Sequence, residues 1–249
     1  MRSETPLHGR PLRFGHSTPL SVPSGIVSPM CGRFVITPNP ETIARFFDAG
    51  EVVTKDLGAS FNVAPTDSIY GIAEHKDERL LGAFRWGFIP WWSKKKGPLH
   101  INARAESVAS SPAFRDAFSR KRCLIPADGF FEWEAGPDGK QPYFIHAPDG
   151  GMLAFAGIWS RWTEPDTGEE LTTSAIITTA SEGPVTSLHD RMPVILPSHL
   201  WDSWLDRDLR NPEEVGHLLQ PVADLELHRV SKLVNNVKNN VPECVMPIE

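Results

Sequence analysis

Several short segments rich in β-branched and aromatic residues recur along the chain, and they restrict its fold more than any other feature. Each is bounded by glycine, proline or charged residues, which is the pattern of a β-strand. Helical patterns stand between them singly, without a regular strand–helix alternation. We therefore predict an α+β fold with a largely antiparallel β core tending to a barrel. The strand segments are residues 69–73, 79–86, 142–147, 152–158 and 172–179.

Short helices are predicted where capping signals precede apolar residues at helical spacing. Residues 39–41, Asn-Pro-Glu, combine an N-cap, a first-turn proline and an acidic first turn, so a helix is expected from there to Gly50. Residues 211–213 repeat this pattern. Two further short helices are expected after Ser111 and after Ser198.

The composition favours a single domain and argues against one class of partner, duplex DNA bound by bulk electrostatics. With 249 residues, 40% of them hydrophobic, the chain can bury a sizeable core, to which we assign Trp86 and Trp133. A formal net charge of −6 argues against a protein that coats duplex DNA by bulk electrostatics. Any nucleic acid would have to be held by a local basic patch. We expect a monomer.

The cysteines and apolar runs indicate a cytoplasmic protein. Cys31, Cys123 and Cys244 are an odd number at wide spacing and form no Cys-x-x-Cys pair, so neither a zinc site nor a disulfide framework is expected. No stretch approaches the roughly 18 apolar residues of a membrane span, and no secretory signal precedes Cys31. A reducing compartment away from membranes fits this pattern.

Residues 1–29 have the composition of a disordered extension or removable leader, ahead of a domain at 30–249. They hold five prolines, five serines, three arginines and one acidic residue, too little apolar surface for ordered structure. A wrongly chosen start codon is the first interpretation. A pro-segment that the protein removes itself is the second, and an organellar transit peptide is the weakest.

Cys31 follows Met30 directly and could therefore become a new N-terminus. A free α-amine has a pKa near ~7.7–8.0 and a thiol one near ~8.5, so both are partly deprotonated around neutral pH. The amine can condense with an aldehyde to a Schiff base, and the thiol can then close on the imine carbon to give a thiazolidine. An amide nitrogen cannot begin this sequence.

Seven short blocks occur together and in order along the chain. They are MCGRF at 30–34, FNVAPT at 61–66, WGFIPWW at 86–92, INARAE at 101–106, ADGFFEW at 127–133, LHDR at 188–191 and VKN at 237–239. With these blocks the sequence resembles the SOS-response-associated peptidase (SRAP) family, whose members crosslink to abasic sites in single-stranded DNA. The resemblance covers roughly residues 30 to 247, although family members begin at the Met-Cys pair and this chain carries 29 residues ahead of it.

The 101–106 block places alternate polar side chains on one face if its backbone is extended. Asn102, Arg104 and Glu106 would then share that face and line a site. The resemblance implies that Asn102 hydrogen-bonds near Cys31 and that Arg104 grips a DNA phosphate. The alternative is an edge strand with a solvated polar face.

Glu132 and His189 are the candidates for proton transfer. Glu132 lies between Phe131 and Trp133, and burial in such a segment raises a carboxyl pKa toward neutrality, as general acid–base catalysis requires. The resemblance implies that His189 assists at the deoxyribose oxygen while Arg191 binds an adjacent phosphate. A lysine-paired glutamate and a histidine bonded locally to Asp190 are the ordinary alternatives.

The remaining candidates for DNA contact are Arg33, Pro65 and the pair Trp91 and Trp92. The two tryptophans precede a lysine run at 94–96, and aromatic residues beside cations suit single-stranded nucleic acid. Taken alone, such tryptophans are usually core and such lysines a solvated turn. Pro65 is either a wedge against an exposed base or a rigid turn residue.

Three functions remain open at this stage. The first is an enzyme that forms a thiazolidine crosslink through Cys31 with abasic single-stranded DNA, by lyase-like Schiff-base chemistry. The second is an N-terminal-nucleophile thiol peptidase that removes the residues before Cys31. The third is a non-catalytic module that binds single-stranded DNA. Aldehyde capture implies no cofactor and no metal.

Overall fold

A closed five-stranded barrel forms the centre of the molecule and confirms the predicted fold class. Its strands are joined in the ring order β4-β5-β11-β10-β7, and back to β4. The computed structural model describes residues 31–76, 78–97, 99–137, 139–222 and 224–249, so the expected leader at 1–29 lies outside the described residues. The barrel strands are β4 (Ser68–His75), β5 (Glu78–Trp86), β7 (Arg122–Ala127), β10 (Leu153–Thr163) and β11 (Glu170–Ala180).

Most neighbours in the ring are antiparallel, and one parallel pair closes it. β11 runs parallel to β5, with Thr173 opposite Arg85 and Ser174 opposite Trp86. β11 also carries two short strands that matter for the site, β6 (Asn102–Arg104) and β12 (Arg191–Pro193). A two-residue strand, β2 (Glu51–Val52), extends the sheet beside β5. β11 is therefore the scaffold from which several candidate residues are presented.

A second sheet lies beside the barrel and carries the N-terminal part of the described chain. It has the order β13-β9-β8-β1-β3. The chain enters it from β7 through Asp128, whose Oδ2 accepts hydrogen bonds from the backbone N–H and the hydroxyl of Thr37, at 2.8 and 2.6 Å. The strands are β1 (Phe34–Ile36), β3 (Ser60–Val63), β8 (Gly129–Gly136), β9 (Gly139–His146) and β13 (Glu226–Arg229).

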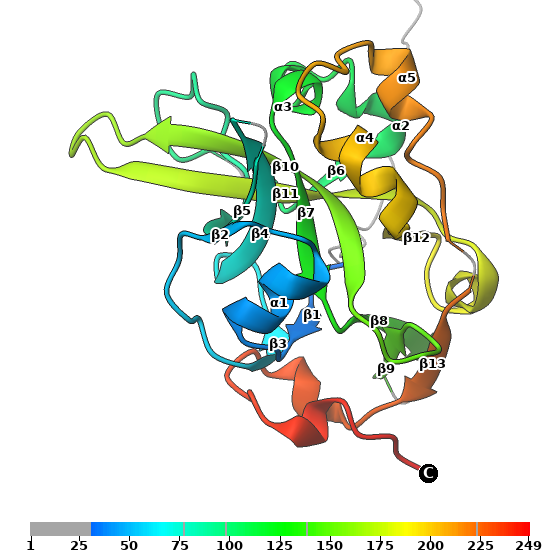
Figure 1. Cartoon of the computed structure of the whole chain (residues 1–249). Coiled ribbons are helices and arrows are strands. Elements are labelled where there is room, and N and C mark those ends of the chain that lie inside the picture. Colours follow the sequence, from blue (N-terminus) through cyan, green and yellow to red (C-terminus); the bar gives the residue numbers. More distant parts are fainter. Residues whose placement is uncertain (1–30, 77, 98, 138, 223) are drawn as a thin grey trace, which may run out of the picture.

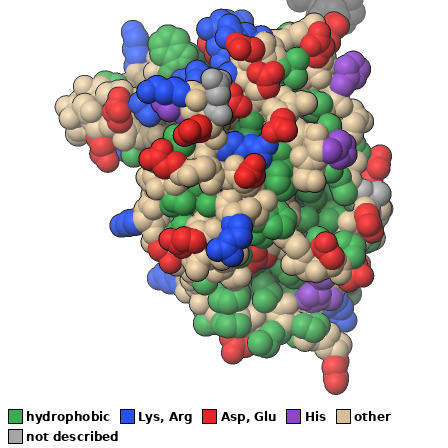
Figure 2. Space-filling view, in the orientation of Figure 1, with side chains coloured by type: hydrophobic (Ala, Val, Ile, Leu, Met, Phe, Trp, Pro, Cys, Tyr) green, Lys and Arg blue, Asp and Glu red, His purple; other side chains and the backbone are tan. Residues whose placement is uncertain are grey.

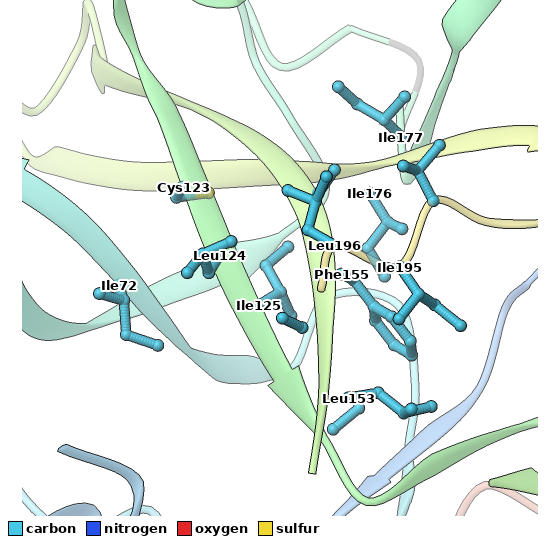
Figure 3. Packing of buried hydrophobic residues seen from close by; sticks show 14 of the residues in the cluster. Ile72, Cys123, Leu124, Ile125, Leu153, Phe155, Ile176, Ile177, Ile195 and Leu196 are labelled. Atoms are coloured by element: carbon cyan, nitrogen blue, oxygen red, sulfur yellow. The ribbon is translucent and has the colours of Figure 1, made fainter. Parts of the chain in front are cut away.

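The barrel core is built from the buried strands β7, β10 and β11. All of β7 is buried, and its Leu124 and Ile125 pack with Phe155 and Ile176 (Figure 3). Gly157 is required here, because a Cβ at that position would come within 2.9 Å of the Cys123 sulfur. A rigid core of this kind fixes where the strand ends project.

The helices are short and cover the ends of the barrel (Figure 1). The predicted caps are confirmed: Asn39 accepts a hydrogen bond from Thr42 N–H at 2.9 Å and Asn211 accepts one from Glu213 N–H at 3.0 Å. The first helix ends at Phe46 and not at Gly50, because Asp48 already has a left-handed backbone, with φ 53°. The helices are α1 (Pro40–Phe46), α2 (Ala105–Val108), α3 (Arg115–Arg120), α4 (Trp201–Leu205) and α5 (Pro212–Gly216), with 3₁₀ turns η1 (Gly183–Ser187), η2 (Ser198–Leu200), η3 (Lys232–Asn235) and η4 (Pro242–Cys244).

Acidic and basic side chains are interspersed on the face that Figure 2 shows. The side chains behind the net charge of −6 therefore do not form a single acidic patch on this face. Within the described ranges, no helix is long and apolar enough to cross a membrane.

Candidate functional site around Cys31

The antiparallel pairing of β1 with β8 brings Cys31 to Glu132. Phe34 lies opposite Phe130, so the residues before Phe34 run alongside those after Phe130. The backbone N–H of Cys31 donates a hydrogen bond to Oε1 of Glu132 at 2.9 Å. Cys31 has φ 42°, a left-handed conformation that is uncommon for a residue with a side chain. The Cys31 nitrogen, which would become the α-amine, is therefore hydrogen-bonded to the side chain of Glu132.

Burial controls the protonation of this pair. Only 3% of Glu132 and 2% of Cys31 is exposed. Burial raises the pKa of the Glu132 carboxyl, against the charge of His189 and the hydrogen bonds from Cys31, which lower it. Burial also raises the pKa of the Cys31 thiol, and the Glu132 charge and hydrogen bond raise it further, while Arg191 lowers it. This direction is the one expected from the aromatic neighbours of Glu132, whereas its part in proton transfer stays a prediction.

Arg191 is held by the carboxylate of Glu106 at the edge of the site. Its two terminal nitrogens donate to Oε1 and Oε2 of Glu106, at 2.5 and 2.9 Å, and one of them also donates to the Thr178 carbonyl at 2.6 Å. Nε of Arg191 is buried and has no hydrogen-bond partner among the residues that the structure describes. The hydrogen bonds from Arg191 are the first cause of the lowered pKa of Glu106.

The prediction that Glu106 shares an extended face with Asn102 and Arg104 is wrong. β6 ends at Arg104, and α2 begins at Ala105, so Glu106 lies in the first turn of a helix. An acidic residue is favoured there by the helix dipole. Asn102 and Arg104 do remain on β6, two residues apart, with the buried Ala103 between them. Arg104 is exposed and Asn102 is half-buried.

His189 lies in the loop between η1 and β12. Its Nδ1 accepts the backbone N–H of Arg191 at 3.0 Å and lies 2.9 Å from Oδ1 of Asp190. A backbone N–H can only donate, so this bond requires an unprotonated Nδ1 and places the proton of a neutral ring on Nε2. The Asp190 contact becomes attractive only in the protonated ring. In that protonated form, the charge of His189 also lowers the pKa of Glu132.

Comparison with known proteins identifies the family of this chain. Residues 30–237 match the family model described as SOS response associated peptidase (SRAP). The chain belongs to the SRAP family. It is 40% identical over 222 residues to the abasic site processing protein YoqW of Bacillus subtilis. The matched region covers 87% of this chain and 99% of that protein.

Two further comparisons extend over most of the chain. The abasic site processing protein YedK of Escherichia coli is 31% identical over 229 residues, covering 88% of this chain and 100% of that protein. A crystal structure of a protein from Bacteroides thetaiotaomicron superposes with a TM-score of 0.78 at 25% identity, covering 88% of this chain and all of that one.

Arg33, in the first SRAP block, is engaged inside the protein. Its Nη1 donates to Oδ1 of Asn62 and to the Val234 carbonyl, both at 2.9 Å. Burial lowers the pKa of Arg33, and the charge of Asp67 opposes that effect. Contact between Arg33 and DNA stays a prediction.

Asn62 is a residue whose role sequence reasoning missed. Its amide nitrogen donates to the carbonyls of Val234, Asn236 and Asn239, at 3.2, 3.0 and 2.9 Å. These bonds fasten the C-terminal segment, which includes the VKN block, to β3. The only signal in the sequence is a polar residue inside a short β-branched and aromatic segment.

The predicted aromatic contacts divide into buried and exposed residues. Trp86 is fully buried, as expected. Trp133 is only half-buried, packs against the smaller core cluster and donates from Nε1 to Asn235 Oδ1 at 2.7 Å, so its assignment to the core is confirmed only in part. Trp91 and Trp92 are exposed, and Pro65 is partly exposed in the turn after β3. Within the described part of the chain, no group of three or more His, Cys, Asp or Glu residues is placed to hold a metal ion.

Proposed function

We propose that this SRAP protein processes abasic sites in single-stranded DNA by forming a covalent thiazolidine crosslink through Cys31. The observation that carries the proposal is the 2.9 Å contact between the Cys31 nitrogen and a buried carboxyl group whose pKa is raised. The names of the YoqW and YedK relatives, which are abasic site processing proteins, support the same substrate.

The crosslink needs two bonds to one carbon. The free α-amine of Cys31 adds to the aldehyde carbon of the ring-opened sugar, and a proton moves from nitrogen to oxygen to give a carbinolamine. Protonation of that hydroxyl releases water and leaves the imine. The Cys31 sulfur then adds to the imine carbon, its proton passes to nitrogen, and the five-membered ring closes.

Glu132 is the proton carrier in this scheme. Because its pKa is raised, the carboxyl is better suited to accept a proton from the attacking amine and to give one to the departing hydroxyl. Its contact with the nitrogen places it beside both transfers. His189, whose charge reaches Glu132, assists at the deoxyribose oxygen.

In this proposal the DNA strand is positioned by Arg104, Arg191 and Asn102. Arg104 is exposed at the end of β6, where it can contact a phosphate. Arg191 is already paired with Glu106, and its buried Nε is the donor left to bind a phosphate or sugar oxygen. Asn102 orients the reacting groups near Cys31. Free thiol chemistry requires a reducing compartment, so we place the protein in the cytoplasm.

The geometry also favours a second activity, self-removal of the residues before Cys31. The Cys31 thiol would add to the preceding carbonyl carbon, and the carbon–nitrogen bond would break as the nitrogen gains a proton. Glu132 lies 2.9 Å from that leaving nitrogen and can supply the proton. Water then hydrolyses the thioester. This step produces the amine that the crosslink requires.

A direct test compares two forms of the protein whose N-termini are verified by intact mass. One form begins at Cys31. The other keeps the residues before Cys31, because a substitution prevents their removal. Each is mixed with a single-stranded oligonucleotide carrying one abasic site and then heated. We expect a heat-stable shifted band only from the form that begins at Cys31. A band of equal yield and rate from the extended form would overturn the proposal, because its Cys31 nitrogen is an amide.

A further inference from the structure

A hollow opens at the end of the barrel where the β4–β5 and β10–β11 hairpins turn. It is lined by the last residues of β4, by β5, by the second half of β10 and by the start of β11, and its volume is about 400 Å³. β10 and β11 project past the barrel as a long hairpin (Figure 1). We name this cavity the hairpin hollow. The mouths of β-barrels are preferred places for ligand sites, whose volumes are typically about 300–1,000 Å³.

Two stacked aromatic rings form the floor of the hairpin hollow. The rings of Phe84 and Trp159 have centroids 6.0 Å apart and planes inclined by 20°. The Phe84 ring lies against the backbone of Gly71, where a Cβ would overlap it, so β4 needs a glycine there. Val53, which also lines the hollow, is 54% exposed. An apolar floor with an exposed apolar rim is a surface that an apolar side chain of a partner can cover.

Two arginines at the hairpin hollow have no acidic partner. Arg161 of β10 and Arg207, which follows α4, both line the hollow and are exposed. Among the described residues, neither guanidinium forms a salt bridge. One carboxylate, Glu74, lines the hollow as well, and its charge acts on the buried Arg122. In a protein with a net charge of −6, two such cations beside an apolar floor favour an anionic partner at this place.

Lys121 adds a third positive charge close to the floor. It does not line the hairpin hollow, but its Nζ lies 5.3 Å from the centre of the Trp159 ring. Burial lowers the pKa of Lys121, and the charges of Arg161 and Arg207 lower it further. The three cations therefore repel one another, and a bound carboxylate would relieve that repulsion.

The backbone that carries Arg207 is held in place before any ligand binds. Nε of the buried Arg122 donates to the Trp204 carbonyl at 2.6 Å, and its Nη2 donates to the Leu209 carbonyl at 2.9 Å. These two carbonyls lie on either side of Arg207 in the chain. A fixed backbone loses little conformational entropy on binding, which favours affinity.

β5 has a short stretch of open backbone along the hairpin hollow. On the side away from β4, it pairs with β2 at residues 80–81 and with β11 at residues 85–86. Between these two registers, residues 82–84 have no strand partner on that side in the described chain. All three line the hollow, and Ala83 is exposed. Open strand backbone can pair with the N–H and C=O groups of an added peptide.

We propose that the hairpin hollow binds an acidic peptide segment of a partner protein. One aromatic or aliphatic side chain of the peptide covers the floor of Phe84 and Trp159, and its carboxylates pair with Arg161 and Arg207. The open backbone of β5 favours a peptide over a nucleotide, because a peptide brings its own main-chain donors and acceptors. This inference does not rest on the proposed function.

The hairpin hollow and the Cys31 site lie toward opposite ends of β11. Thr172 lines the hollow, whereas Arg191 donates to the Thr178 carbonyl. The six residue steps between them span roughly 20 Å at about 3.3 Å per residue. A peptide in the hollow would therefore leave the Cys31 site open, so it could tether the protein to a partner without blocking the chemistry.

The probe is a fluorescein-labelled peptide of about ten residues with one phenylalanine flanked by aspartates, titrated by fluorescence anisotropy. Two matched peptides carry asparagines in place of the aspartates, or alanine in place of the phenylalanine. The protein variants are Arg161→Ala, Arg207→Ala and the two combined. Arg115→Ala is the control, because Arg115 is exposed on α3 and does not line the hollow. All these arginines are exposed, so the melting temperatures should stay close to wild type.

We expect each single arginine variant to weaken binding of the acidic peptide about two- to fivefold, and the double variant roughly five- to twentyfold. Arg115→Ala should bind like wild type, and both matched peptides should bind at least about fivefold more weakly than the acidic one. The proposal is overturned if wild type shows no saturable binding up to about 1 mM peptide, or if the double variant binds as tightly as wild type.

Two further titrations separate a peptide from a nucleic acid. If deoxyadenosine monophosphate bound more tightly than the peptide and lost that affinity in the double variant, the hollow would be a nucleotide site and the proposal would fail. The double variant should bind an undamaged single-stranded oligonucleotide and crosslink an abasic one as wild type does. Slower crosslinking would assign the two arginines to the DNA strand instead. Because peptide binding involves no aldehyde, a failure of wild type to crosslink would leave the peptide result standing.

Discussion

Replacing Glu132 by glutamine separates proton transfer from every other role of this residue. The glutamine side chain has nearly the same size and could still accept the Cys31 N–H through its amide oxygen, so the 2.9 Å contact can be kept. It cannot exchange a proton near neutral pH. General acid–base catalysis contributes about 10²–10⁴ in rate, or roughly 3–5 kcal/mol of barrier. We expect Glu132→Gln to slow crosslinking by that factor.

DNA affinity should change little in the same variant, because Glu132 is 3% exposed and offers almost no surface to a strand. The assay is the single-turnover rate of heat-stable adduct formation on an abasic oligonucleotide, alongside binding of the undamaged strand. Asp128→Asn is the matched control, since burial also raises the pKa of Asp128 but its partner is Thr37. A Glu132→Gln rate equal to wild type would remove Glu132 from the mechanism.

Three other predictions follow from the contacts of the site. Arg104→Ala should weaken single-strand binding and reduce the salt slope by about 0.7, the value for one phosphate contact on a single strand, as measured by titration at several salt concentrations; an unchanged slope would exclude that contact. Asn62→Ala should cost about 3 kcal/mol or more, a fall of roughly 6–12 °C in melting temperature, because several carbonyls and Arg33 lose a partner. Glu106 has a lowered pKa, so it stabilises the fold above its unfolded pKa of about 4.3, and that contribution is lost as the pH falls through the folded value. The melting-temperature difference between wild type and Glu106→Gln should therefore shrink on acidification, and a constant difference would contradict the Arg191 pairing.

Local signals in the sequence predicted much of the fold. The capping patterns before α1 and α5 depend on residues within one helical turn, and both caps form as expected. The burial of Glu132 followed from its aromatic neighbours on one strand. The barrel tendency followed from the number of short strands, but its closure by the parallel pairing of β5 and β11 depends on residues far apart in the chain.

The parts that could not be predicted depend on long-range partners. Glu106 lies 85 residues from Arg191, and nothing near either residue indicates the pair. Arg33 suits a phosphate when its block is considered alone, whereas its Nη1 is bound by the Asn62 side chain and by a carbonyl 201 residues away. Trp133 packs against the smaller core cluster but is only half-buried, and its indole N–H donates to Asn235 of η3. Each case is a tertiary contact that alters the role suggested by the local pattern.

The central claim is that both the nitrogen and the sulfur of Cys31 bond to the abasic carbon, and Cys31→Ser tests it most directly. This variant keeps the amine, but a hydroxyl is a much poorer nucleophile than a thiolate for closing the ring. With its N-terminus verified at residue 31, it should give little heat-stable adduct unless borohydride reduces the imine, and it should cleave more of the strand. Wild type should need no reductant. An equally heat-stable Cys31→Ser adduct without borohydride would show that the thiol is not part of the linkage.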